Sequence, residues 1–204
     1  MTPLATRTVL TITMLALLAG CGIFNKAAET LDAYTLSPLA GDGDAQGATR
    51  HLVVELPTSS GALATDRILI KPNRLQAEYL PAGRWVDATP VLVQTLLVAS
   101  LQNSGAFRLV GRDGAGLSPD YQLLIEVNDF QAEAPVDGVD ATPVRVSLTM
   151  TLVRDEDGSL IATRRFEHSA VASSSETLAL VSAFDQATQK VLSDTVAWIV
   201  RLTR

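Results

Sequence analysis

The strongest structural signal in this sequence is a strict alternation of apolar and polar residues over 144–152. The apolar positions are Val144, Val146, Leu148, Met150 and Leu152, and arginine, serine and threonine lie between them. Because successive side chains of a β-strand point to opposite faces, this pattern predicts a strand with one buried face. The acidic run Asp155–Gly158 is predicted to turn the chain, and 160–171 to return as an antiparallel partner. Such a sheet needs a cover on its apolar face.

An apolar stripe over 176–202 predicts a helix that supplies this cover. Its members recur at intervals of three and four: Val181, Phe184, Thr188, Val191, Thr195, Trp198 and Leu202. The same spacing is compatible with a coiled coil formed with a partner, but the need to cover the sheet favours a helix on its own sheet. Ser173–Ser175 is predicted to cap this helix, and Glu176 to complement its dipole.

A second helix is predicted over 87–104, with Asp87 or Thr89 as the cap, Pro90 in the first turn and Gly105 at the end. A further long strand is predicted over 121–128, where Leu124 interrupts the alternation. Shorter strand patterns are 32–38, 52–56, 68–70, 74–79 and 107–110. The predicted fold is therefore a single α+β domain, a mainly antiparallel sheet with two helices packed on one face.

The amino-terminal segment has the layout of a bacterial secretory signal. Arg7 precedes an apolar run from Val9 to Leu18. This run is too short to cross a bilayer, because a membrane-spanning helix needs ~20 apolar residues. Leu18-Ala19-Gly20-Cys21 resembles the lipobox of bacterial lipoproteins. In that class the chain is cut before the cysteine, here between Gly20 and Cys21, and the cysteine then carries diacylglyceryl and N-acyl lipid. The alternative is an ordinary signal peptide with an incidental cysteine.

This resemblance implies three segments. Residues 1–20 are expected to be the signal peptide, 21–31 a lipidated tether, and 32–204 the folded domain. Cys21 is the only cysteine, so its lipidation would leave no thiol for a disulfide. The chain carries a formal charge of −6, and loss of Arg7 with the signal makes it −7 (−6 − 1). An acidic domain of this kind is a poor nucleic-acid binder.

The residues give no positive indication of a metal, a cofactor or catalysis. Two histidines and no free cysteine make a zinc site improbable. The pair Asp42/Asp44 and the turn at 155–158 lack the rest of a calcium loop. The glycine-rich run 111–116 lacks the following helix and lysine-serine pair of a phosphate loop. No Gly-x-Ser-x-Gly elbow is present, although the members of a Ser-His-Asp triad need not be neighbours in sequence. We therefore expect a protein that is not an enzyme.

Several weak motifs occur in an order that points to one family. They are Tyr34-x-Leu36 soon after the cysteine, Arg84-Trp85 before the Pro90 helix, and Ala183-Phe184, Ala187 and Trp198 in the closing helix. The chain resembles the ABC-type transport auxiliary lipoprotein family over nearly all of its mature length. Members are encoded with MCE (mammalian cell entry) domain proteins and ABC transporters, and the family brings no catalytic motif.

The resemblance implies a periplasm-facing lipoprotein subunit that docks an intermembrane lipid transport system at the outer membrane. Its partners would be an MCE-domain protein, the ABC transporter, the membrane through the lipid, and further copies of itself. The alternative is a lipoprotein that carries lipid or another small molecule as cargo between sheet and helix. A large apolar pocket would favour the carrier, and a filled core with an exposed apolar patch would favour docking.

We predict that Cys21→Ser leaves an uncleaved or unlipidated precursor, because the thiol is the group that receives the diacylglyceryl chain. Mass spectrometry of the mature amino terminus checks this prediction. A free, unacylated terminus at another residue of the wild-type protein would contradict it.

Overall fold

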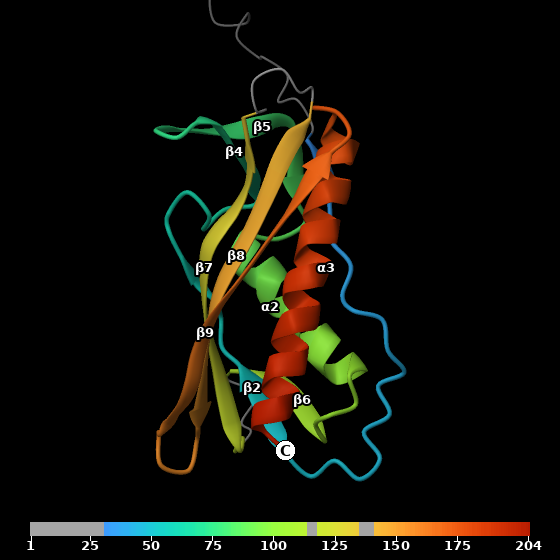
Figure 1. The fold of residues 1–204 in the computed structure, drawn as a ribbon, viewed down its shortest axis with the longest axis vertical. Helices are drawn as coiled ribbons and strands as arrows, with labels where there is room; N and C mark the ends of the chain where they lie inside the picture. The colour runs from blue at the N-terminus through green and yellow to red at the C-terminus, as the bar shows by residue number, and fades with distance from the viewer. Residues whose placement is uncertain (1–30, 114–117, 135–140) are drawn as a thin grey trace, which may run out of the picture. The chain divides into compact units, whose positions relative to one another are not determined.

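A single mixed β-sheet carries two helices on one side (Figure 1). The computed structural model describes residues 31–113, 118–134 and 141–204, and Leu31–Arg204 forms one compact unit. Within these described residues the sheet has nine strands. The predicted α+β fold with two covering helices is confirmed. The expected signal peptide, Gly20, Cys21 and nearly all of the tether lie outside the described residues.

The central strand of the sheet is β7 (Tyr121–Glu133). One of its edges pairs antiparallel with β8 (Thr142–Arg154), which in turn pairs antiparallel with β9 (Leu160–Ala172). The predicted hairpin over 144–171 is thus confirmed. Its strands are long, and the buried apolar side chains of β8, together with Phe166 of β9, face the helices.

The other edge of β7 pairs with three short parallel strands in succession. They are β2 (His51–Val54), β3 (Thr58–Ser59) and β4 (Arg67–Asn73). Three more strands complete the sheet: β5 (Gln76–Trp85) beside β4, β1 (Asp32–Tyr34) beside β5, and β6 (Leu109–Arg112) beside β2. Five strand pairs are therefore parallel in the described chain, which the mainly antiparallel prediction did not foresee.

Two prolines lie inside strands, just beyond the ends of the predicted strands 68–70 and 74–79. Pro72 lies in β4 and Pro81 in β5, and the predicted strands 68–70 and 74–79 are accordingly too short. Both prolines fall in stretches where the β4–β5 register shifts. A proline is tolerated there because the regular ladder of backbone hydrogen bonds is already interrupted. The predicted strand 32–38 starts with β1 but is too long, and the predicted strand 107–110 is offset from β6.

The helices are α2 (Thr89–Asn103) and α3 (Thr177–Leu202). Pro90 lies in the first turn of α2 as predicted, but the residue before the helix is Ala88, and its side chain makes no cap. The backbone N–H of Thr89 instead donates to the carbonyl of Thr65 at 3.0 Å. The serine cap predicted for α3 is also wrong, because Glu176 occupies the cap position and makes no capping side-chain bond.

Aromatic side chains fill the space between α3 and the sheet. Phe184 packs against Trp85 and Phe130, with ring centroids 5.1 and 5.2 Å away, and all three side chains are fully buried. Further along α3, Trp198 packs edge-on against Phe166 of β9 at 5.6 Å. The apolar stripe of α3 therefore lies on its own sheet, as predicted. In the described part of the chain, neither helix is long and apolar enough to cross a membrane.

Trp198→Ala should destabilise the domain by roughly 3–5 kcal/mol, because it removes a side chain that is only 7% exposed and leaves a cavity beside Phe166. A chemical denaturation midpoint reports the loss. Leu178→Ala on the same helix is the matched control, since Leu178 is 69% exposed and its truncation should change little. A wild-type midpoint for Trp198→Ala would contradict this packing.

Candidate interaction surface on the uncovered face of the sheet

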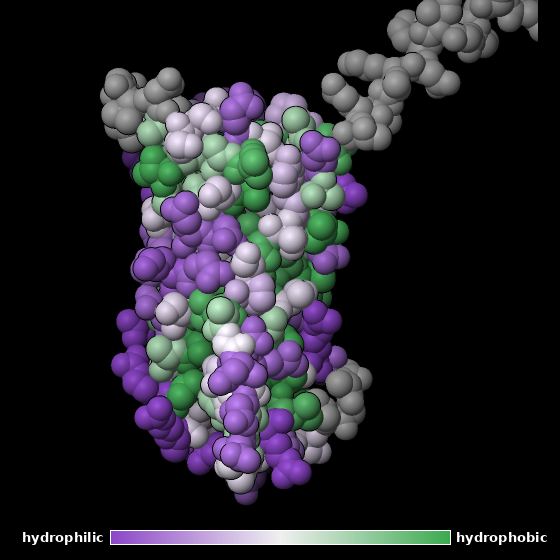
Figure 2. Space-filling view, turned by 90° about the vertical axis from the view of Figure 1, so that its right-hand side faces the viewer, coloured by the Kyte–Doolittle hydropathy of each residue, from purple (hydrophilic) through white to green (hydrophobic). Residues whose placement is uncertain are grey.

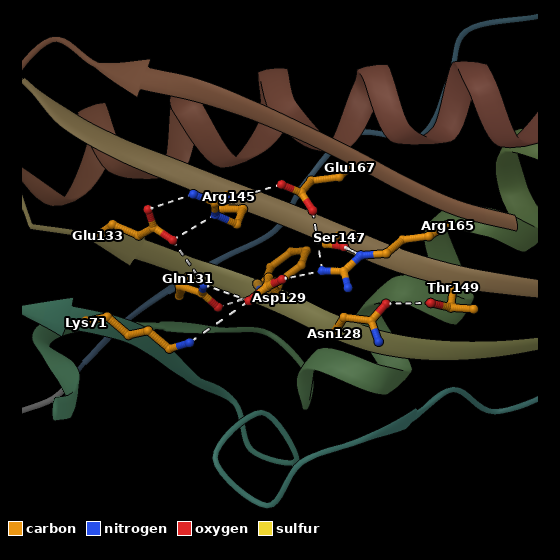
Figure 3. Close-up of polar contacts among 11 residues, drawn as sticks. Lys71, Asn128, Asp129, Gln131, Glu133, Arg145, Ser147, Thr149, Arg165 and Glu167 are labelled. Atoms are coloured by element: carbon orange, nitrogen blue, oxygen red, sulfur yellow. Dashed lines mark hydrogen bonds and ion pairs between the residues drawn. The ribbon is translucent and has the colours of Figure 1, made fainter. Parts of the chain in front are cut away.

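The face of the sheet opposite the helices carries a network of charged side chains (Figure 3). At its centre Arg145 of β8 lies between Glu133 of β7 and Glu167 of β9. Its guanidinium donates to both carboxylate oxygens of Glu133, from Nε at 2.8 Å and from Nη2 at 3.2 Å. Nη1 donates to Glu167 at 2.7 Å. One arginine thus joins the three long strands.

A second arginine extends this network along the same face. Arg165 of β9 donates from Nε to the hydroxyl of Ser147 at 2.7 Å and from Nη2 to Asp129 at 2.9 Å. Asp129 also lies 4.0 Å from the ammonium of Lys71 on β4. The contacts of Asp129 therefore connect β4, β7 and β9.

A bulge in β7 shapes this part of the surface. Val127 pairs with Leu148 and Asp129 with the adjacent Ser147, so Asn128 is the extra residue. The Asn128 side chain accepts a hydrogen bond from Thr149 at 2.7 Å. Gln131, almost fully buried, donates to Asp129 at 3.0 Å and so fills the space between the carboxylates.

The charges of this network are paired with one another. Each of its carboxylates, on Asp129, Glu133 and Glu167, has a cationic partner within the described residues. The hydrogen bond from Arg145 lowers the pKa of Glu133, and the same contact raises the pKa of Arg145 above its already high value. Glu133 and Arg145 are therefore held ionised, and all the charged groups of the network are paired, which suits them to stabilise the sheet and leaves no evident base or nucleophile among them.

A groove of about 460 Å³ lies further along the same face, where β7 and β8 meet the end of β2. Leu56 and Leu124 line it and remain 55% and 42% exposed. Two carboxylates, Glu55 and Glu126, also line it. Partial burial raises the pKa of Glu55, and the nearby charge of Asp113 adds to the shift. Leu124, which interrupts the alternation in the sequence, therefore contributes an apolar side chain to an otherwise polar face.

A second groove, of about 610 Å³, lies on the helix side between β9 and α3. Phe166, Val196 and Val200 supply apolar walls, and Arg164, Arg201 and Arg204 supply cationic groups. Arg164 lies over the Phe166 ring at 5.0 Å. On the side of the molecule that carries α3, hydrophobic and hydrophilic residues are interspersed (Figure 2).

The residues considered for metal binding or catalysis do not converge. Asp44 and Asp157 accept hydrogen bonds from backbone groups two residues further on, at 3.0 Å each, as in ordinary turns. His168 bonds to Asp194 at 2.8 Å, and His51 lies at the start of β2. The described residues contain no group of three or more acidic, histidine or cysteine side chains placed to hold a metal ion.

Comparison with known proteins identifies the family. The model of the ABC-type transport auxiliary lipoprotein component family matches residues 34–197. The chain belongs to this family. It is thus a lipoprotein, anchored to a membrane, and its family is described as that of auxiliary components of ABC-type transport systems. The family is not known as enzymatic.

Individual proteins are also similar to this chain in sequence or in fold. The uncharacterized protein bll6063 of Bradyrhizobium diazoefficiens is 32% identical over 152 residues, which are 73% of this chain and 39% of that protein. The chain therefore spans well under half the length of that curated relative. The fold is similar to that of protein XCC0632 from Xanthomonas campestris, with a TM-score of 0.74 at 23% identity, covering 85% of this chain and 96% of that one. Another crystal structure of an uncharacterized protein matches with a TM-score of 0.65 at 19% identity, covering 84% and 99%.

Neutralising Glu133 and neutralising Glu55 should change the stability of the folded domain in opposite directions. The pKa of Glu133 is lowered below its ordinary 4.5 by folding, so its charge stabilises the folded state above that pH and this stability is lost as the pH falls. Glu133→Gln should therefore lower the free energy of unfolding at pH 7 by about 0.5–1 kcal/mol, as for a partly exposed ion pair.

Glu55→Gln is the matched comparison. Because folding raises the pKa of Glu55, its charge disfavours the folded state at pH 7, and its neutralisation should raise the melting temperature. Melting curves from pH 7 to pH 3.5 measure both variants. The Glu55→Gln difference from wild type should shrink as the pH falls toward 4.5, through the raised pKa of Glu55, and the Glu133→Gln difference should shrink below pH 4.5. Melting temperatures that change in the same direction in both variants at pH 7 would contradict these opposite pKa shifts.

Proposed function

We propose that the protein is the lipoprotein subunit of an MCE/ABC-type intermembrane lipid transport system, facing the periplasm and docking the system at the outer membrane. Family membership supports the transport association. Lipid on Cys21 would supply the anchor, because several acyl chains together give stable membrane attachment. Residue 22 is glycine, and this chain thus lacks the aspartate after the cysteine that retains many lipoproteins at the inner membrane.

The groove on the uncovered sheet face carries the docking proposal. Leu56 and Leu124 are exposed there, whereas the apolar side chains between the sheet and the helices are packed against one another. Exposed apolar groups within a polar rim are typical of protein interaction sites. Glu55 and Glu126 make this rim acidic, so a complementary MCE segment would present apolar side chains beside lysine or arginine.

A cargo carrier is the second candidate, and the groove between β9 and α3 favours it. Arginines beside apolar walls suit an anionic amphiphile, whose phosphate and acyl chain need those two environments. The groove is open to solvent along the helix and is not enclosed between sheet and helix. We therefore rank docking first.

A soluble version that begins after Cys21 should still bind the MCE-domain partner but fail to restore envelope integrity in a deletion strain. The anchor confines the domain near its partner, and its loss lowers the effective concentration without removing a contact. Pull-down and extractable lipid are measured on the same preparation. Leu124→Glu should abolish the pull-down, and Leu75→Glu, at a fully exposed position on the β4–β5 turn, is the matched control.

Stoichiometric bound lipid without any MCE interaction would overturn the docking function and establish the carrier. Equal binding by the Leu124→Glu variant and the wild-type protein would place the docking surface elsewhere.

A further inference from the structure

The long strand β9 has an unpaired edge. It contains 13 residues and pairs with β8, and no other strand of the described chain pairs with it. Exposed edges of this length are usually protected by prolines, bulges or charges, because their free N–H and C=O groups invite another strand. β9 contains no proline, and the one register shift in its pairing lies near its beginning, between Leu152 and Val153 of β8. Charged side chains are the protection that remains.

The charges of β9 are arranged around its centre. Arg165 and Glu167 point to the uncovered face, where they bond to Ser147 and Arg145. Phe166, between them, points to the helices and packs on Trp198. A strand with opposite charges placed symmetrically about one residue is complementary to an antiparallel copy of itself.

We propose that β9 is an interface between two copies of the protein, which pair antiparallel about a two-fold axis at Phe166. In this register Arg165 lies opposite Glu167 of the second copy. The other pairs also match in chemistry: Thr163 with Ser169, Ile161 with Val171, and Ala162 with Ala170. Directly opposed side chains of opposite charge or of similar polarity stabilise such a pair. The interface is isologous and therefore closes as a dimer.

The same charges exclude the neighbouring registers. A shift of the axis to Arg165 places the two copies of this arginine opposite each other, and a shift to Glu167 does the same for the glutamate. Like charges directly opposed are destabilising. A register shift by one residue would place side chains of the uncovered face of one copy on the same side as the helices of the other copy. Arg165 and Glu167 thus disfavour most other strands and registers at this edge, but they favour a second copy in the register centred on Phe166.

The helix side is compatible with the same arrangement. Arg164 lies opposite His168 of the second copy, and the His168 ring is bonded to Asp194 of α3 at 2.8 Å. The arginine of each copy therefore approaches a carboxylate of the other. The groove between β9 and α3 lies beside this edge, so a second copy would cover its apolar walls.

Paired cysteines test the register in the full-length lipoprotein in its membrane. Thr163→Cys combined with Ser169→Cys should form an intermolecular disulfide, because opposed residues of an antiparallel pair are ~4.5–5.5 Å apart at Cα. Each single variant is the matched control. Its two cysteines would lie six residues apart along the strands, or ~20 Å, which is beyond disulfide reach. A dimer from the double variant alone supports the proposal, and equal yields from double and single variants overturn it.

A charge exchange separates dimer pairing from stability within one copy. In the double-cysteine background, Arg165→Glu should abolish the linked dimer, because it opposes Glu167 of the second copy. Adding Glu167→Arg restores opposite charges across the axis but leaves each new charge facing a like charge within its own copy, at Asp129 and Arg145. Recovery of the dimer supports the interface. Failure to recover in a variant that circular dichroism shows to be folded would overturn it.

Discussion

The structure depends on β7, because every other strand of the sheet pairs either with β7 or with a strand that is joined to it. One edge is occupied along nearly its whole length by β8. The other edge is shared by three short strands that lie in register with its beginning, middle and end. Short strands such as β3 are too small to be stable alone. They are held because β7 offers a continuous ladder, and they in turn orient α2 through the connection at Thr65.

This arrangement divides the sheet into two faces with different roles. The helix-covered face contains the aromatic cluster of Trp85, Phe130 and Phe184, which joins β5, β7 and α3 in one fully buried group. The uncovered face contains ion pairs at one end and the exposed pair Leu56 and Leu124 further along. Stability therefore comes mainly from one face, which leaves the other free to bind a partner. A lipoprotein that docks a transport system needs this division, because its binding surface must remain exposed while the domain stays folded.

Features with a local period could be predicted from the sequence. The alternation over 144–152 gave the β8–β9 hairpin, and the three-and-four spacing of residues such as Phe184 and Trp198 gave α3 and the face that it buries. The parallel pairing of β2, β3 and β4 with β7 could not be predicted, since alternation reports which face is buried and not which strand lies alongside. β5 continues through Pro81, beyond the predicted end at 79, because proline is compatible with a strand where the ladder of hydrogen bonds is irregular, and that irregularity is a property of the β4–β5 pair.

The candidate surface was also hard to predict, because a local pattern does not show which strands lie side by side. Arg145, Glu133 and Glu167 come from three strands, and their contact depends on the register and on the bulge at Asn128. Leu124 was the one visible signal, as an apolar residue on the polar side of its strand. The lipobox is a local motif, so Cys21 could be predicted as the lipid attachment site from sequence alone, and this stays a prediction because the cysteine lies outside the described residues.

We propose that the transport partner binds the uncovered face of the sheet. The most direct measurement is photocrosslinking in the native membrane, with a photoreactive amino acid at position 124 of the full-length lipoprotein and, in a second strain, at position 178 on the exposed side of α3. We expect a crosslink from position 124 to an MCE-domain protein and a much weaker one from position 178. A crosslink from position 178 alone would contradict it.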